Sequence, residues 1–262
     1  MTGAKIRVVV AGACGRMGRE TCKAVSAAED MALVGVCDTT FVGCSLAEAL
    51  GEGVPDLQVR DDLDALLGDC GPDVVVDFTT PAAVLGNVRT AVRRKVSIVV
   101  GATGLTPGDV RSEEQLARES GVGIIIAPNF AIGAVLMMKF AAEAAKHMPA
   151  VEIIELHHDK KLDAPSGTSI ITAEMIAQAR GDAQAAQEQP AARGAEHKGV
   201  RIHSVRLPGL VAHQEVVFGG LGQTLTIRHD SLERTSFMPG VLLAIRKARE
   251  IRGLVYGLDK IL

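Results

Sequence analysis

The chain has 262 residues, with 28 Lys and Arg against 31 Asp and Glu, which gives a formal net charge of −3. This slightly acidic balance does not fit a nucleic-acid-binding protein, and only 3% of the residues are aromatic, which leaves few side chains on which bases could stack. The composition, 47% hydrophobic and 23% charged, is that of a packed globular protein.

Continuous apolar runs in the first half of the chain predict parallel strands that are covered on both faces. These runs are Ile6–Ala11, Ala32–Cys37, Val74–Phe78, Val96–Val100 and Val122–Ala127. Helical patterns lie between several of them, near Arg16–Ala28, Ala82–Arg94 and Thr106–Ser120. This alternation predicts an α/β fold with a doubly wound parallel sheet over residues 1–130.

The pattern changes after about Asn129, where a smaller α+β domain with an open mixed sheet is expected. The predicted elements are helices at Gly133–His147, Gly167–Arg180 and Gly240–Arg252, and strands at Val151–His158, Arg201–Leu207, Val211–Gly219 and Thr224–His229. The predicted strands Arg201–Leu207 and Thr224–His229 roughly alternate apolar and polar residues. One face of this sheet should therefore be solvated or paired with another subunit. The Ala/Gln-rich segment Gly181–Gly199 is predicted to be a mobile loop.

Cysteine usage and hydropathy predict a cytoplasmic protein that does not enter a membrane. The five cysteines are odd in number and form no C-x-x-C pair, which indicates free thiols in a reducing compartment. The N-terminal apolar stretch runs directly into a glycine turn, unlike a signal peptide. The uncharged stretch Ser120–Met138 has the length of a membrane span, but Pro128 and Asn129 in its middle favour a strand, a turn and a helix start.

A glycine-rich turn follows the first predicted strand and opens a predicted helix. It reads G-A-C-G-R-M-G and comprises Gly12, Ala13, Cys14, Gly15, Arg16, Met17 and Gly18. Glycine permits positive φ and a close approach of the backbone to a pyrophosphate, and the unpaired N–H groups at a helix start favour a phosphate. Between a strand and a helix the motif predicts dinucleotide binding, although its spacing is G-x-x-G-x-x-G.

Asp38 ends the second predicted strand, about 20 residues beyond the last glycine, where a carboxylate can accept hydrogen bonds from a ribose hydroxyl. A carboxylate also repels a 2′-phosphate, and no Lys or Arg follows until Arg60, so this position favours NADH. Arg16 could accept a 2′-phosphate, which leaves NADPH open. The alternative interpretation is that the glycines only form a turn and that Asp38 only ends a strand.

Other strand ends should point toward the same crevice, because open parallel sheets bind ligands at the carboxyl ends of their strands. The candidate cofactor-binding residues at these ends are Phe78, Thr79, Gly101, Ala102, Thr103, Ala127, Pro128, Asn129 and Phe130. Their small and polar groups could line the nicotinamide and ribose, and ordinary β-α turns explain them equally well.

The second half contains the segment E-L-H-H-D-K-K-L-D-A-P-S-G-T, residues 155–168. His157 and His158 can reach one site if the strand ends there, and together with Lys161 they would supply a proton donor and a cationic grip. Each of these residues, taken alone, is also compatible with a satisfied histidine or a solvated lysine. No suitably spaced third His or Cys accompanies the histidines, so no metal site is predicted.

The residues P-S-G-T open the next predicted helix. Ser166, Gly167 and Thr168 would present backbone N–H groups and hydroxyls to a carboxylate or phosphate. Plain helix capping is the alternative. An anion site beside a proton donor, on a chain with a dinucleotide domain, predicts acid–base chemistry on a small acid.

The H-H-x-x-K-x-D-A-P-S-G-T run closely resembles the signature of the dihydrodipicolinate reductase family. G-A-C-G-R-M-G, D-F-T, G-A-T-G, A-P-N-F-A-I-G and G-L-V-A-H-Q-E-V-V-F occur in the order expected for that family, so the similarity covers nearly the whole chain. The resemblance implies a Rossmann-like nucleotide domain, residues 1–130, rejoined by the C-terminal segment 240–262. It implies a substrate-binding and oligomerisation domain, residues 131–239, and a homotetramer formed through the second sheet.

The resemblance also implies a reaction and residue roles. The reaction would be reduction of 4-hydroxy-tetrahydrodipicolinate, a small dicarboxylate, to tetrahydrodipicolinate by NADH or NADPH in lysine and diaminopimelate biosynthesis. By the same resemblance His157 is the proton donor, Lys161 is the second acid–base residue, and His158, Gly167 and Thr168 bind substrate carboxylate. Many members carry Arg directly after the acid that ends the second strand; Thr39 stands there in this chain, which argues against a strong NADPH preference.

Two other functions remain open from the residues alone. One is a different two-domain NAD(P)-dependent dehydrogenase, for example one that acts on an amino acid. The other is a non-catalytic NAD-sensing module. The reductase interpretation depends on a shared cleft in which the reduced cofactor and the 155–168 segment face the same small diacid.

Overall fold

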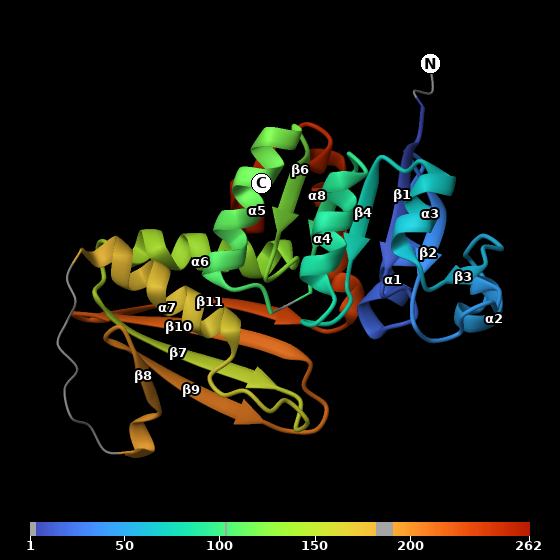
Figure 1. The fold of residues 1–262 in the computed structure, drawn as a ribbon. Helices are drawn as coiled ribbons and strands as arrows, with labels where there is room; N and C mark the ends of the chain where they lie inside the picture. Colours follow the sequence, from blue (N-terminus) through green and yellow to red (C-terminus); the bar gives the residue numbers. More distant parts are fainter. Residues whose placement is uncertain (1–3, 103, 182–190) are drawn as a thin grey trace. The chain divides into compact units, whose positions relative to one another are not determined.

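The computed structural model describes residues 4–102, 104–181 and 191–262. By its internal contacts the chain divides into two compact units. The first consists of Met1–Phe130 with Phe237–Leu262, and the second of Ala131–Ser236. Figure 1 shows the elements of each unit along the chain.

A seven-stranded parallel sheet forms the centre of the first unit, in the order β12-β6-β5-β4-β1-β2-β3. Its strands are β1 (Ile6–Ala11), β2 (Met31–Cys37), β3 (Val59–Arg60), β4 (Val74–Asp77), β5 (Ser97–Val100), β6 (Gly123–Ile126) and β12 (Gly253–Tyr256). The strand order reverses between β1 and β4, the point at which sheets of this kind bind ligands.

Helices cover both faces of this sheet, and they explain why its strands are apolar throughout. The helices are α1 (Arg16–Ala27), α2 (Leu46–Leu50), α3 (Leu63–Cys70), α4 (Val84–Arg93), α5 (Pro107–Ser120) and α8 (Met238–Ala248). α1 and α8 pack together on one face, whereas α3, α4 and α5 pack on the other. The central residues Val8–Val10 and Val74–Val76 are fully buried, as expected for parallel strands between two helical layers.

The second unit contains a five-stranded mixed sheet in the order β11-β10-β7-β9-β8. Its elements are α6 (Ile132–Ala145), β7 (Ala150–His157), α7 (Gly167–Arg180), β8 (Ala195–His197), β9 (Val200–Arg206), β10 (Ala212–Gly220) and β11 (Gln223–Ser231). α6 and α7 pack against each other and against the sheet. The buried Ile153, Ile202 and Phe218 form the apolar part of the covered face.

The sheet register sorts the side chains of the second unit into two faces. Glu155 on β7 is paired with Gln214 on β10 and with Ser204 on β9, so these three residues lie on the covered face. Glu152, three residues earlier, lies on the opposite face. This second face is called the outer face below.

The structure confirms the predicted fold class, a doubly wound parallel sheet with a smaller α+β domain. Among the described residues, the elements that were not predicted are the α-helices α2 and α3, the strands β3, β8 and β12, and the three short 3-10 helices Ala191–Arg193, Arg234–Phe237 and Leu258–Lys260. The interpretation of Gly181–Gly199 as a mobile loop is wrong for its end, because β8 pairs there with β9; residues 182–190 lie outside the described residues. A strand of three residues is too short to show a period, so only its pairing partner reveals it.

Candidate active site

Glycine is required at two positions of the turn that follows β1. Gly12 has φ +75°, and a Cβ atom there would lie 2.6 Å from the carbonyl oxygen of Phe78. A Cβ atom on Gly18 would lie 1.9 Å from the carbonyl oxygen of Gly12. Gly15 is the N-cap of α1 and offers no side chain to the first N–H groups of the helix. The turn therefore keeps backbone donors available at a helix start, which suits a phosphate.

Asp38 connects the end of β2 to this turn. Its Oδ2 accepts a hydrogen bond from the backbone N–H of Cys14 at 2.8 Å. Its Oδ1 accepts from the N–H and the hydroxyl of Thr40 at 2.9 and 2.8 Å. Because a carboxylate oxygen can accept more than one hydrogen bond, Asp38 can hold the turn and still receive a ribose hydroxyl.

A cavity of about 1040 Å³ opens at the carboxyl ends of β1, β2 and β4. Six of the predicted cofactor residues line it: Gly12, Cys14, Gly15, Asp38, Phe78 and Thr79. Thr39, Thr40, Asp61, Asp62 and Asp64 also line it. Its position at the reversal of strand order, its glycine turn and its uncapped helix start together fit a dinucleotide.

A buried carboxylate shapes the wall of this cavity at the end of β4. Asp77 is fully buried; its Oδ1 accepts from the N–H and hydroxyl of Thr79 at 2.8 and 2.6 Å, and its Oδ2 accepts from the amide of Asn87 at 2.8 Å. Burial raises the pKa of Asp77, and the hydrogen bonds from Thr79 and Asn87 oppose that rise. Asp77 therefore fixes the loop that carries Thr79.

The remaining predicted cofactor residues of the first unit do not line this cavity. Ala13, Gly18, Ala127 and Phe130 are buried, Met17, Gly101, Ala102 and Asn129 are half-buried, and Arg16 and Pro128 are exposed. The Phe130 ring packs edge-on against Phe78 with 5.7 Å between ring centroids, and a Cβ atom on Gly101 would lie 2.1 Å from the same Phe78 ring. Phe130 and Gly101 therefore support the wall at Phe78, while Thr103 lies outside the described residues.

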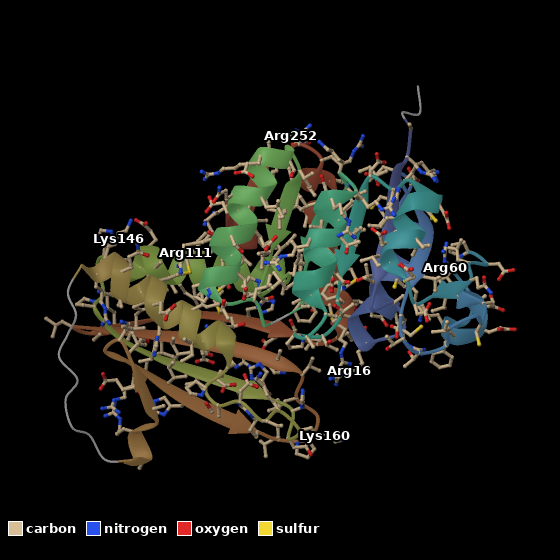
Figure 2. All side chains as sticks on the ribbon, viewed as in Figure 1. Arg16, Arg60, Arg111, Lys146, Lys160 and Arg252 are labelled. Carbon is tan, nitrogen blue, oxygen red and sulfur yellow. The ribbon has the colours of Figure 1, made fainter. Side chains whose placement is uncertain are left out.

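Two arginines, Arg60 and Arg16, are candidate cations for the Asp38 end of the cavity, and Arg60 is already paired. Arg60, at the end of β3, makes an ion pair with Asp69 of α3 at 2.7 Å. Arg16 is exposed at the first turn of α1; Figure 2 labels both arginines. Asp61, Asp62 and Asp64 also line the cavity. Asp64 is paired with Arg93 and Arg94, so Asp61 and Asp62 are the carboxylates that add negative charge beside Asp38.

His157 is the last residue of β7, so the strand ends where the D-K-K sequence predicts. Its Nδ1 forms a hydrogen bond with Oε2 of Glu155, which is fully buried. Arg206 of β9 donates to both Glu155 oxygens, at 2.8 and 2.7 Å. The side chain of His157 is 14% exposed, which leaves part of the ring open to a ligand. His158, just beyond the strand end, is half-buried.

The loop after β7 holds Lys161 close to this cluster. Lys161 Nζ donates to both oxygens of Asp163, at 2.7 and 2.8 Å. The hydrogen bond from Lys161 lowers the pKa of Asp163, so that carboxylate is ionised at neutral pH. The carbonyl oxygen of Asp163 accepts from Arg206 at 2.7 Å, which ties the loop to β9.

α7 begins at Gly167 with Ser166 as its N-cap. The Ser166 hydroxyl is buried, accepts from the N–H of Ser169 at 3.3 Å and lies 2.8 Å from the Ser169 hydroxyl. Its side chain therefore caps the helix, which was the alternative to an anion-binding role for that hydroxyl. Gly167 is exposed and Thr168 is half-buried at the helix start.

The ion cluster around Glu155 predicts a defined loss of stability in acid. Burial raises the pKa of Glu155, but hydrogen bonds from His157 and Arg206 outweigh it and bring the value from 4.5 to about 2. A carboxyl group with a lowered pKa stabilises the folded state above its unfolded pKa, and this contribution disappears as the pH falls from about 4.5 to about 2. Chemical denaturation at a series of pH values should show a shallower acid decline for Glu155→Gln than for the parent chain; equal slopes would contradict the assignment. Glu152→Gln is the matched control.

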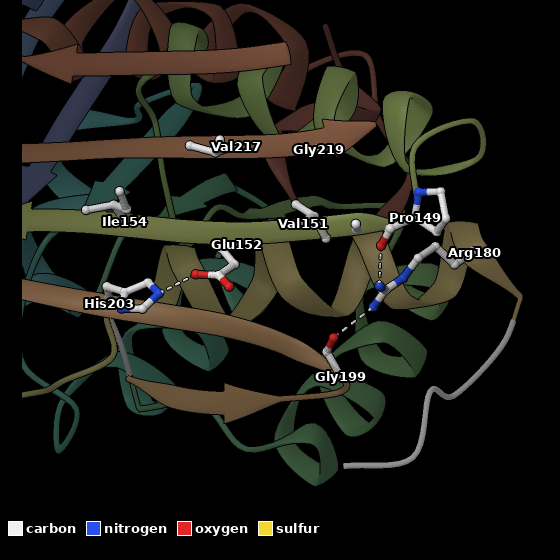
Figure 3. A pocket seen from close by; sticks show the side chains of 10 residues that line it. Pro149, Val151, Glu152, Ile154, Arg180, Gly199, His203, Val217 and Gly219 are labelled. Atoms are coloured by element: carbon white, nitrogen blue, oxygen red, sulfur yellow. Dashed lines mark hydrogen bonds and ion pairs between the residues drawn. The ribbon is translucent and has the colours of Figure 1, made fainter. Parts of the chain in front are cut away.

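A second cavity of about 600 Å³ lies on the outer face of the second unit (Figure 3). Its polar side chains already have protein partners: Glu152 accepts from His203 at 2.7 Å, and Arg180 donates to the carbonyl oxygens of Pro149 and Gly199 at 2.8 and 3.3 Å. This cavity contains none of the predicted site residues.

Sequence reasoning missed Glu155 and Arg206 as neighbours of His157, and missed the acidic residues Asp61, Asp62 and Asp64 of the first cavity. A signal existed for Glu155, because residues two apart on a strand share a face. Within the described residues, no cluster of three or more His, Cys, Asp or Glu side chains could hold a metal ion. Nor does any described helix have the length and apolar character needed to cross a membrane.

Comparisons with known proteins agree along the whole chain. Residues 6–130 match the family described as dihydrodipicolinate reductase, N-terminus, and residues 133–262 match the family described as dihydrodipicolinate reductase, C-terminus. Two curated relatives are named 4-hydroxy-tetrahydrodipicolinate reductase. The one from Syntrophomonas wolfei is 51% identical and covers 98% of this chain and 99% of its own. The one from Listeria welshimeri is 52% identical and covers 98% and 100%.

A solved structure adds a spatial match. It is dipicolinate-bound dihydrodipicolinate reductase from Paenisporosarcina sp. TG-14, 46% identical in sequence, with a TM-score of 0.85. The match covers 98% of this chain and 100% of that chain. On the family matches, the full-length relatives and this fold, the chain belongs to the dihydrodipicolinate reductase family of oxidoreductases.

Proposed function

We propose that this protein reduces 4-hydroxy-tetrahydrodipicolinate to tetrahydrodipicolinate with a nicotinamide cofactor, in lysine and diaminopimelate biosynthesis. The observation that carries the proposal is the His157 cluster: a histidine at a strand end, held by a buried carboxylate, beside Lys161 and a helix start. The full-length relatives bear the name of this activity. The dipicolinate bound to the similar solved structure supports a small dicarboxylate as substrate.

The residues of the second unit would bind the substrate and complete its protonation. When bound, the cofactor supplies the hydride. The substrate ring that receives a hydride gains electron density and must take up a proton, which His157 donates, since histidine exchanges protons near neutral pH. The ammonium group of Lys161 offsets negative charge on the ring and its carboxylate. His158 and the backbone N–H groups of Gly167 and Thr168 bind substrate carboxylate.

The residues of the first unit would hold the dinucleotide. The turn from Gly12 to Gly18 binds the pyrophosphate at the start of α1, and Asp38 accepts from the adenosine ribose. Thr79 and the residues around Phe130 border the nicotinamide end. Thr103 belongs to the same proposal, although it lies outside the described residues.

NADH is the preferred cofactor in this proposal, with NADPH accepted more weakly. The carboxylates of Asp38, Asp61 and Asp62 repel a 2′-phosphate, and the nearby Arg60 is neutralised by Asp69. Asp38→Arg should therefore raise the NADPH-to-NADH ratio of kcat/KM by about 10-fold or more, which corresponds to about 1.4 kcal/mol. Asp30→Asn, which removes a carboxylate that pairs with Arg246 outside this cavity, should change the ratio much less. An unchanged ratio in Asp38→Arg would refute the ribose assignment.

A steady-state assay with both cofactors and enzymatically generated substrate tests the function directly. Substrate-dependent oxidation of NADH or NADPH is the expected result. No turnover of the cyclic dicarboxylate, together with activity on an amino acid, would instead identify another dehydrogenase. Cofactor binding without turnover of any substrate would favour a sensing module.

We also propose a cytoplasmic homotetramer that assembles through the outer face of the second sheet. The helices α6 and α7 do not cover this face of the sheet. Half-buried apolar side chains such as Ile154 and Val217 lie on it beside charged side chains. Light scattering coupled to size exclusion should give four times the chain mass of 27.4 kDa. A monomer at micromolar concentration would contradict the assembly.

A further inference from the structure

Glu155 is a fully buried carboxylate that accepts hydrogen bonds from His157, Arg206 and Ser204. It lies on the covered face of the second sheet, two residues before the end of β7. His157 meets its Oε2, and the two terminal nitrogens of Arg206 meet Oε2 and Oε1. A buried carboxylate needs hydrogen-bonding or charged partners, because removing an unpaired carboxylate from water costs free energy.

Arg206 extends this contact to the loop that carries Lys161. Besides Glu155, it donates to the carbonyl oxygen of Asp163 at 2.7 Å. The carboxylate of Asp163 in turn accepts from Lys161. One continuous path, Lys161–Asp163–Arg206–Glu155–His157, therefore joins the two side chains to which acid–base work is assigned.

The path also determines which ring nitrogen of His157 exchanges a proton. An ionised carboxylate only accepts hydrogen bonds, so the nitrogen that faces Glu155, Nδ1, must carry a hydrogen. This leaves Nε2 as the nitrogen that gives or takes the catalytic proton. A buried ion pair is weak evidence for stability by itself, which makes orientation the better explanation for its presence.

We propose that Glu155 and Arg206 are positioning residues that hold His157 in the Nδ1–H form and aim Nε2 at the substrate. This inference rests on the proposed function of His157 as proton donor. It assigns no contact with substrate to either residue.

The first test uses the parent chain and needs no turnover. Nitrogen NMR of the protein labelled at histidine, with His157→Gln to assign its signal, should report a hydrogen on Nδ1 and none on Nε2 when the ring is neutral. A neutral His157 in the Nε2–H form would overturn the inference, even if the enzyme is active. This result does not depend on the substrate, so it separates the inference from the proposed function.

The second test is kinetic. Glu155→Gln should lower kcat about 10–100-fold, the usual effect of losing a group that orients a reacting histidine, with KM values for both substrates nearly unchanged. In the His157→Gln background, Glu155→Gln should have almost no further effect on kcat, because the residue to be oriented is gone. An unchanged kcat in Glu155→Gln, or an equal further loss in the double variant, would overturn the inference.

The chain offers a matched control on the same strand. Glu152 contacts His203 and Arg193 on the outer face, so it repeats the Glu–His–Arg arrangement outside the proposed site. Glu152→Gln should leave kcat unchanged. If Glu155→Gln fails to fold because Arg206 loses its partner, Glu155→Gln with Arg206→Met removes both charges and should show the same fall in kcat. A double variant with parental kcat would overturn the inference.

Discussion

Replacing His157 by Gln is expected to lower kcat by about 10²–10⁴-fold, the usual contribution of general acid catalysis. Glutamine preserves much of the side-chain size and can still accept from or donate to neighbours, but it cannot transfer a proton near neutral pH. Because His157 belongs to the second unit and the glycine turn to the first, the affinity for NADH should barely change. Stopped-flow and steady-state kinetics, with cofactor binding followed by fluorescence, measure both quantities.

His147→Gln is the matched control for this prediction. His147 is exposed near the end of α6 and lies outside the 155–168 segment, so the same substitution there should leave kcat unchanged. Lys161→Ala should also depress kcat strongly. A kcat for His157→Gln within threefold of the parent value would remove the proposed proton donor.

Replacing Gly18 by Ala is expected to damage both the stability of the first unit and its affinity for the cofactor. The new Cβ atom would lie 1.9 Å from the carbonyl oxygen of Gly12, a backbone atom that cannot move without the whole turn. Forced overpacking of this kind costs about 1–3 kcal/mol. Displacement of the turn should weaken NADH binding by about 10-fold, or 1.4 kcal/mol, because the phosphate donors lie on that turn. Chemical denaturation and equilibrium titration with NADH test the two effects.

Gly108→Ala provides the comparison. Gly108 lies in the first turn of α5, where a Cβ atom would be 3.5 Å from the Thr106 hydroxyl, an ordinary contact. Alanine there should be neutral or stabilise the chain by about 0.5–1 kcal/mol, since glycine in a helix is entropically unfavourable. If Gly18→Ala and Gly108→Ala have the same stability and the same affinity for NADH, the turn tolerates a side chain at Gly18.

Long apolar segments made the sheet and its main helices predictable from sequence. The continuous run Ile6–Ala11 and the helix Gly167–Arg180 were found at the bounds that the structure gives. Shorter helices and strands were harder to predict, because they are marked only by cap residues at their ends or by a pairing partner elsewhere in the chain. α3 begins after the N-cap Asp62 and ends before the left-handed Gly71, which are local signals of a helix start and a helix end. β12 is identified by its pairing with β6, which no local pattern encodes.

The residues of the candidate active site also differ in how well the sequence predicts them. His157 and Lys161 lie close together in sequence, so one motif reveals them both. Arg206 lies 51 residues beyond Glu155, and only the parallel pairing of β7 with β9 brings the two together. Site residues that lie together in one sequence motif can be predicted as a group. Site residues that are brought together by the register of a sheet can be identified only once the fold is known.

The return of the chain to its first sheet has a consequence for biogenesis. β12 covers the edge of β6, and α8 contributes the fully buried Val241, Ala244 and Ile245 to the same layer. During synthesis the edge of β6 and an apolar surface of the first unit therefore stay uncovered until more than a hundred further residues have been made. Stalled or C-terminally truncated translation products should consequently aggregate or recruit chaperones, although they already contain every residue assigned to the chemistry.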